Sequence, residues 1–213
     1  MTRVLLLADL HGRYGKLDSF LALDPDLVFI CGDITQFGPC EDALGLLERI
    51  EVPCLAIPGN CDPPEILDSL EESEAVSIHG RSITLGKITV TGIGGSNRTP
   101  FGTPFELTEE EIGDLLEGAM ERMEKNVHNI LVTHAPPQGT LDRVGENRVG
   151  SPALRRHMKR FDLVCCAHIH EAKGLTEEDG VMVVNPGPAS EGHCALVTLG
   201  DESRDIRIEL LTV

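Results

Sequence analysis

The segment VLLLADLH, residues 4–11, is a short apolar run that ends in two side chains able to hold a metal ion, Asp9 and His11. The pattern recurs four more times, in LVFICGD (27–33), CLAIPGN (54–60), ILVTH (130–134) and LVCCAHIH (163–170). In open α/β sheets, ligands bind beyond the carboxyl ends of the strands, so side chains that follow successive strands converge in space. The sequence therefore predicts one site, built from Asp9, His11, Asp33, Asn60, His134, His168 and His170.

These seven side chains offer carboxylate and amide oxygens and imidazole nitrogens, but no thiolate. This mixture suits manganese, iron, zinc or nickel better than a thiolate-bound structural zinc or a calcium cage. Seven ligands are too many for one tetrahedral ion, whereas two ions about 3.5–4 Å apart can share one carboxylate and keep positions open for substrate. We therefore expect two divalent transition-metal ions, with manganese preferred and iron, zinc or nickel as alternatives.

The first half of the chain alternates short apolar runs with helical patterns, the βαβ rhythm of a parallel sheet. The expected strands are 3–8, 27–31 and 54–57, and the expected helices are 14–23, 40–50 and 63–72. Residues 76–93 change to short strands around turn residues, as in a hairpin.

The second half contains the clearest helix, which begins after Thr108 with Glu111 as its capping-box partner. A strand (130–133), a loop rich in proline and glycine that runs to residue 150, a helix (151–160) and strands at 163–167, 181–185, 193–199 and 205–212 complete the expected elements. The residues alone predict an α/β fold with mixed sheets.

Composition limits the architecture and the partners. The 213 residues show no repeat or linker, so one domain over 1–213 is expected, and its core should be aliphatic because aromatic residues are only 3% of the chain. A net charge of −17 opposes long-range attraction to nucleic acid or anionic membranes. A small phosphate ester is still a suitable partner, because two bound cations would dominate the local field. The oligomeric state stays open, with a homo-oligomer as one alternative.

The seven cysteines form no Cys-x-x-Cys pair, and four of them lie in expected strands, where a free thiol behaves as a small apolar side chain. This usage favours a reducing, cytoplasmic compartment. The N-terminal apolar run is too short for a signal-peptide core, and no stretch approaches the length of a membrane span.

Five motifs carry a family resemblance. Asp9-Leu10-His11, Gly32-Asp33, Gly59-Asn60-Cys61-Asp62, Thr133-His134 and His168-Ile169-His170 resemble, in order, the signature blocks of the calcineurin-like metallophosphoesterase superfamily. Segments 94–112, 133–142, 168–174 and 185–188 look like small phosphoesterases related to bacterial cyclic-AMP phosphodiesterase. One block alone would be weak, but five in order form a specific pattern. The resemblance implies a four-layer α/β/β/α sandwich with two mixed sheets.

The resemblance also implies roles for the site residues. Asp9, His11 and His170 would hold one metal ion, Asn60, His134 and His168 the other, and Asp33 would bridge them. Asn60, Cys61 and Asp62 would form the catalytic block. The implied activity is hydrolysis of a small phosphate ester by metal-activated water, with phosphodiesters preferred over phosphomonoesters. A non-catalytic metal-binding scaffold for partner proteins is the rival class.

Two positions depart from the family pattern. Cys61 stands where histidine is often found, and either takes part in catalysis as a poorer proton source or is a packed side chain. Ala167 stands where glycine is usual, which would strain the backbone only if the position needs a positive φ.

Loop side chains near the same edge are candidates for gripping phosphate oxygens, because arginine offers paired N–H donors. They are Arg13, Asn97, Arg98, Arg143 and Arg148. Their alternative role is surface charge.

Overall fold

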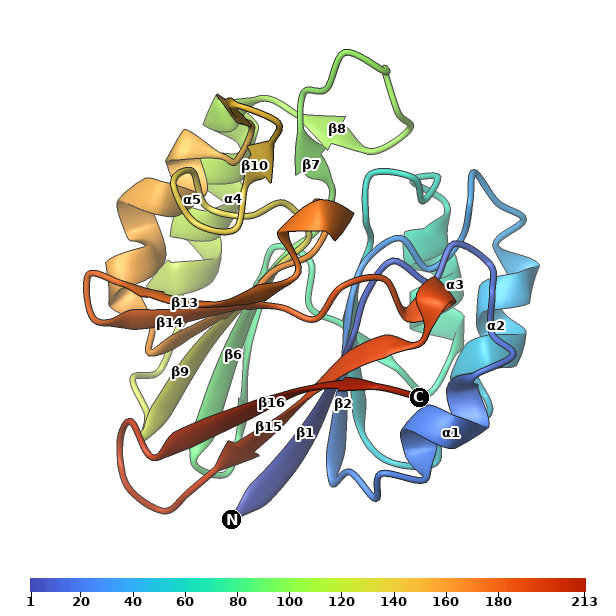
Figure 1. Ribbon diagram of the computed structural model, residues 1–213, viewed down its shortest axis with the longest axis horizontal. Helices are drawn as coiled ribbons and strands as arrows, with labels where there is room; N and C mark the ends of the chain where they lie inside the picture. Colours follow the sequence, from blue (N-terminus) through green and yellow to red (C-terminus); the bar gives the residue numbers. More distant parts are fainter.

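Two six-stranded mixed sheets lie face to face in the computed structural model, which describes residues 1–213, and helices cover the outer face of each sheet (Figure 1). The α/β class and the four-layer α/β/β/α arrangement predicted above are therefore confirmed. None of the helices is long and apolar enough to cross a membrane.

The first sheet has the order β16-β15-β1-β2-β3-β4. Its strands are β1 (Thr2–Leu7), β2 (Leu27–Cys31), β3 (Cys54–Ile57), β4 (Val76–Ser77), β15 (His193–Leu199) and β16 (Ile206–Thr212). Strands β1 to β4 run parallel, and β15 and β16 pair antiparallel. The outer face carries α1 (Leu17–Leu21), α2 (Glu41–Leu47) and α3 (Ile66–Glu72), which share a core cluster with the sheet.

The second sheet has the order β13-β14-β12-β9-β6-β5. Its strands are β5 (Arg81–Leu85), β6 (Ile88–Ile93), β9 (His128–Thr133), β12 (Leu163–Cys165), β13 (Gly174–Glu178) and β14 (Val181–Asn185). The four central strands are parallel, and both edge strands are antiparallel. Helices α4 (Glu109–Glu121) and α5 (Pro152–His157) cover this sheet, and α4 begins with the predicted capping box of Thr108 and Glu111.

Short elements project from the upper edge of the sandwich in Figure 1, where the carboxyl ends of the parallel strands lie. They are β7 (Ser96–Asn97), β8 (Glu106–Leu107), the hairpin of β10 (Arg143–Val144) with β11 (Asn147–Arg148), and the 3-10 turns η2 (His170–Ala172) and η3 (Ala189–Glu191). A further 3-10 turn, η1 (Met158–Arg160), follows α5 and leads into β12. The sequence predicted a plain loop up to residue 150 and no strand at β13. Both differences have one cause, because these strands are largely exposed and lack an apolar run.

The layer between the two sheets is an aliphatic core. Twenty buried residues form it, and Phe29 is its only aromatic member. Burying each Val, Leu or Ile side chain contributes about 1.5–3 kcal/mol relative to exposure. The predicted aliphatic core is confirmed, and it holds the carboxyl ends of the parallel strands at one common edge.

Candidate metal centre

Five parallel strands from the two sheets carry all seven predicted ligands just beyond their carboxyl ends. Asp9 and His11 follow β1, Asp33 follows β2, Asn60 follows β3, His134 follows β9, and His168 and His170 follow β12. Backbone hydrogen bonds join neighbouring loops: Asp9 N donates to Gly32 O at 3.1 Å, and His11 N donates to Asp33 O at 2.9 Å. Side chains scattered over more than 160 positions thus meet at one end of the inter-sheet layer.

The backbone at this edge is held in an unusual conformation. Asp9, His11, Asp33 and His168 have φ values of 52°, 48°, 50° and 69°, in the left-handed region that non-glycine residues rarely adopt. Each such residue costs of order 1–3 kcal/mol, and such strain clusters at functional sites. Ala167 has no positive φ, so an alanine there is unstrained.

The first group of side chains contains buried polar atoms that have no hydrogen-bond partner. His11 Nε2 lies 3.3 Å from His170 Nε2, which is 3.6 Å from Asp9 Oδ1. Both carboxylate oxygens of Asp9 are fully buried and accept no hydrogen bond, and His11 Nδ1 is likewise unpartnered. A buried carboxylate is costly unless a cation compensates it, so this group fits a metal ion.

In the second group, two hydrogen-bond acceptors face each other with no proton between them. His134 Nδ1 lies 2.8 Å from the carbonyl oxygen of Cys31, which only accepts, so Nδ1 carries the proton. In the neutral imidazole, Nε2 then presents a lone pair, and it faces Asn60 Oδ1 at 2.9 Å. Two acceptors at this separation repel each other unless a cation lies beside both. These residues therefore fit a second metal ion.

Asp33 lies between the two groups and faces each with a different oxygen. Its Oδ1 is 3.5 Å from His134 Nε2, and its Oδ2 is 3.8 Å from His11 Nε2. The backbone N–H of Cys61 donates to Oδ1 at 2.7 Å and fixes the carboxylate orientation. This is the geometry that a bridging carboxylate needs.

His168 completes the second group, with its ring centroid 5.1 Å from that of His134. Burial lowers the pKa of His168 to about 3, so the ring is neutral and able to bind a metal. Asn185 holds this segment: its Nδ2 donates to Ile169 O at 2.9 Å, and its Oδ1 accepts from Gly187 N.

Cys61 and Asp62 differ in environment although they are adjacent. The half-buried Cys61 sulfur lies within 4.8 Å of the ligand atoms of His11 and Asp33. Burial, with the neighbouring Asp33 carboxylate, raises the pKa of the Cys61 thiol.

Asp62 is fully buried and faces the loop backbone. Its carboxylate accepts from Ile34 N, Thr35 N, Thr35 Oγ1 and Gly59 N at 2.7–3.1 Å. Burial, with the charge of Asp33, raises the pKa of Asp62 to about 6, while these hydrogen bonds oppose the shift.

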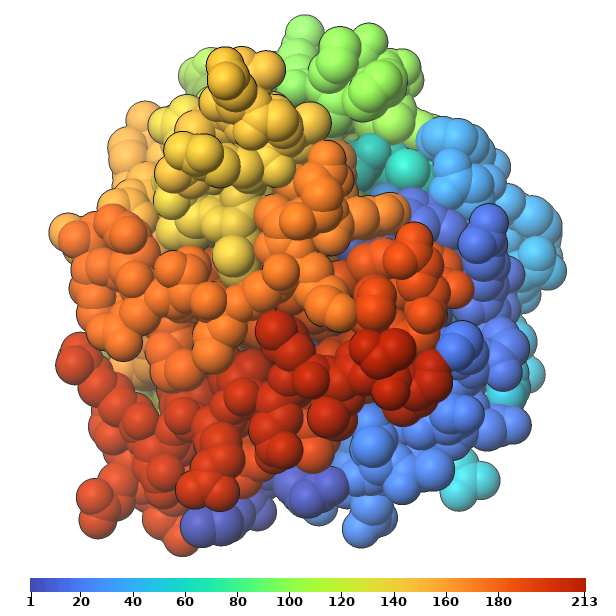
Figure 2. Space-filling view, in the orientation of Figure 1, coloured from blue at the N-terminus to red at the C-terminus, as the bar shows by residue number.

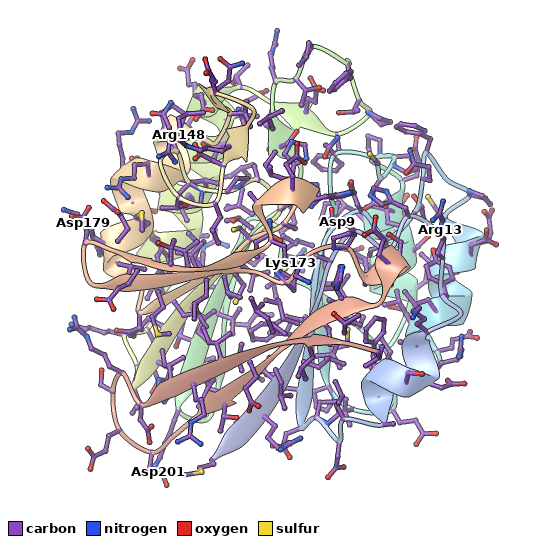
Figure 3. All side chains as sticks on the ribbon, viewed as in Figure 1. Asp9, Arg13, Arg148, Lys173, Asp179 and Asp201 are labelled. Carbon is purple, nitrogen blue, oxygen red and sulfur yellow. The ribbon has the colours of Figure 1, made fainter.

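A cavity of about 720 Å³ adjoins the metal centre at His168. Its walls include residues 98–101, in the loop seen in green at the top of Figure 2, and the β10–β11 hairpin, in yellow. Of the five predicted substrate contacts, Asn97, Arg98 and Arg148 line this cavity, and Arg13 and Arg143 do not. Figure 3 places Asp9 between Arg13 and Arg148, which lie on opposite sides of it.

Two of these cavity residues are already engaged within the chain. Arg148 Nη1 donates to the buried Asp142 carboxylate at 2.6 Å, and Asn97 Nδ2 donates to Val149 O at 3.1 Å. Asp142 also accepts from Gly139 N and Gly150 N, so it anchors the hairpin. No hydrogen bond within the chain engages the Arg98 guanidinium, which leaves it free for a ligand.

Three residues near the site were missed from the sequence: Thr103, Glu106 and Asp142. Thr103 and Asp142 lie on loops and Glu106 begins the two-residue strand β8, and no spacing or apolar periodicity singles them out. Asp142 had one signal, its place in a turn rich in proline and glycine, where aspartate often caps backbone N–H groups.

Comparisons with known proteins agree with this geometry. Residues 2–172 match the family model described as calcineurin-like phosphoesterase. The uncharacterized protein MJ1162 of Methanocaldococcus jannaschii is 37% identical over 201 residues, which cover 88% of this chain and 89% of that protein.

Two solved structures share the fold. TT1561 of Thermus thermophilus is 22% identical, covers 99% of this chain and 98% of its own, and has a TM-score of 0.78. An archaeal phosphodiesterase is 16% identical, covers 98% of this chain and 99% of its own, and has a TM-score of 0.55. The family model matches most of the chain, so the chain belongs to the calcineurin-like phosphoesterase family.

Proposed function

We propose that this protein is a dinuclear-metal phosphodiesterase that hydrolyses a small phosphate ester. The observation that carries the proposal is the state of the side chains on either side of Asp33. On one side, the Asp9 oxygens and His11 Nδ1 are buried without a hydrogen-bond partner. On the other, the His134 Nε2 lone pair faces Asn60 Oδ1. Membership of a phosphoesterase family supports the same reading, and one structural neighbour is itself described as a phosphodiesterase.

The donor geometry supports a particular division of ligands. Asp9, His11 and His170 would hold one ion, Asn60, His134 and His168 the other, and Asp33 both. When bound, two divalent ions would polarise the phosphate oxygens and lower the pKa of an attacking water towards neutrality. We keep manganese as the preferred ion, with iron, zinc or nickel as alternatives.

Other residues of the chain position the proposed ligands and the substrate. Asp62 accepts hydrogen bonds from the loops that follow β2 and β3, and so it shapes the turn that carries Asn60. We assign it this positioning role in place of the catalytic role that its motif implied. The Cys31 carbonyl holds the His134 tautomer. Arg98, which has no partner within the chain, is placed to pair with a phosphate oxygen or another polar ligand group.

The cavity favours a diester over a monoester. A phosphate group fills only a small part of about 720 Å³, and two exposed apolar side chains line the walls, Phe101 at 83% and Val144 at 40% exposure. A diester carries a second organic group, which these side chains could cover. This is our reason for preferring phosphodiesters, with phosphomonoesters as the alternative class.

Initial rates on a bis-aryl phosphodiester and on the matching aryl phosphomonoester, both with added manganese, test the proposal. We expect the diester to react faster, and we expect a chelator to stop both reactions. A faster monoester reaction would favour the alternative substrate class. Full metal content without turnover of either ester would favour the scaffold reading.

A separate prediction concerns Cys61. A thiol is a weak hydrogen-bond donor, so leaving groups that depart without a proton should be favoured. We expect Cys61→His to increase the turnover of unactivated alkyl phosphomonoesters, because a positioned general acid contributes about 10²–10⁴ in rate. The measurement is rate against leaving-group pKa for wild type, Cys61→His and the control Cys61→Ser. Equal slopes in all three would mean that Cys61 is only a packed side chain.

A further inference from the structure

One carboxylate, that of Glu106, organises the loop that faces the metal centre. It accepts four hydrogen bonds: from Thr99 N at 3.1 Å, Thr99 Oγ1 at 2.5 Å, Thr103 N at 2.8 Å and Thr103 Oγ1 at 2.6 Å. Partial burial would raise the pKa of Glu106, but the hydrogen bonds from Thr103 and Thr99 lower it to about 2. The group is therefore an ionised acceptor at neutral pH.

Thr103 connects this carboxylate to the metal centre. Asn60 Nδ2 lies 3.0 Å from Thr103 Oγ1. The Thr103 hydroxyl has one proton, and the ionised Glu106 carboxylate at 2.6 Å can only accept it. Towards Asn60 the hydroxyl therefore presents a lone pair, which the amide NH₂ satisfies and the amide oxygen does not.

The opposite orientation of the Asn60 amide would leave one acceptor without a proton. If the Asn60 amide were rotated by 180°, its oxygen would face Thr103 Oγ1, and the single hydroxyl proton could not serve both this oxygen and Glu106. With the observed orientation, Oδ1 faces His134 Nε2 at 2.9 Å. The loop contact thus decides which atom of the amide points into the centre.

We propose that Thr103 and Glu106 are positioning residues for the metal centre: Glu106 fixes the Thr103 hydroxyl, and the hydroxyl fixes Asn60 with its oxygen towards the second ion. The proposal rests on the proposed function, since it takes Asn60 as a ligand. Thr99 and Phe101 of the same loop line the substrate cavity. One carboxylate therefore anchors both a ligand orientation and a wall of the cavity.

Calorimetric titration of chelator-stripped protein with Mn²⁺ tests the proposal without using activity. Wild type should bind two ions. In Thr103→Val, which is nearly isosteric but has no hydroxyl, one of the two sites should weaken about 10–100-fold, the usual effect of removing a residue that orients a ligand. The other site should keep its affinity. Thr103→Ser restores the hydroxyl and should restore the affinity.

Thr99 supplies a matched control, because it bonds to the same carboxylate but does not touch Asn60. Thr99→Val should leave both Mn²⁺ affinities within about two-fold of wild type, whereas Thr103→Val should not. Equal losses in the two valine variants would mean that the loop acts only as a structural support, and would overturn the proposal.

An Asn60→Asp background separates orientation from packing. Aspartate presents oxygen in either orientation, so the loss caused by Thr103→Val should disappear there, as a double-mutant cycle would record. The same loss of Mn²⁺ affinity in both backgrounds would contradict the proposal that Thr103 orients Asn60. Absence of a second Mn²⁺ site in wild type would instead refute the dinuclear function itself, so the two failures are distinguishable.

Discussion

Asp33→Asn should lose more bound metal and more turnover than any other single ligand substitution in this chain. Asp33 faces both groups of ligands, with Oδ1 3.5 Å from His134 Nε2 and Oδ2 3.8 Å from His11 Nε2, and it alone is proposed to serve both ions. Its loss removes a negative charge from both ion sites together. We expect kcat to fall by about 10²-fold or more, which corresponds to about 2.7 kcal/mol of transition-state stabilisation.

Metal analysis and initial rates on Asp33→Asn, Asp9→Asn and Asp201→Asn provide the comparison. Asp9 is proposed as a ligand of one ion only, so its variant should be damaged less. Asp201 pairs with Lys87 at the opposite end of the molecule (Figure 3), and its variant should match wild type. If Asp33→Asn keeps its metal and near-parental turnover, the bridging assignment is wrong.

Gly59→Ala should destabilise the fold and empty the metal centre together. A Cβ at Gly59 would overlap both the backbone N and Oδ1 of Asp33, an approach that no real contact allows. The β2 and β3 loops would have to separate, which moves Asp33 and Asn60 apart. We expect a loss of at least about 3 kcal/mol of unfolding free energy, at the upper end for overpacking.

Urea unfolding of chelator-stripped protein measures this loss directly. The control is Gly118→Ala, on the exposed face of α4, where a Cβ meets nothing within 4 Å. That substitution should stabilise the protein by about 0.5–1 kcal/mol, because alanine favours helix over glycine. A Gly59→Ala protein as stable as wild type would show that the loops adjust, and would refute the tight approach of the two strands.

The sequence predicted those parts of the fold that depend on burial. The strands 27–31 and 54–57 have the predicted bounds because they are buried on both faces and therefore read as continuous apolar runs. The seven candidate ligands, which the fold brings to one edge, could be named because each one follows such a run. The helix expected at 14–23 is shorter, Leu17–Leu21, since no side chain caps its N-terminus.

Features that depend on tertiary contacts could not be predicted from the sequence. The hydrogen bond between Asn60 and Thr103 spans 43 positions, and β13 is an edge strand whose side chains are mostly exposed or half-buried. Arg148 was proposed as a substrate contact, and its engagement by Asp142 follows only from the fold of the hairpin. The metal roles of the ligands and the single domain over 1–213 stay predictions.

Metal content is the most direct measure of the central claim. Elemental analysis of protein purified without chelator should find two transition-metal ions per chain. Removing them should abolish phosphodiester hydrolysis, and adding back manganese should restore it. Occupancy should weaken as pH falls through the histidine range, because imidazole binds a metal only in its neutral form. One tightly bound ion with undiminished turnover, or hydrolysis that survives complete metal removal, would contradict the account.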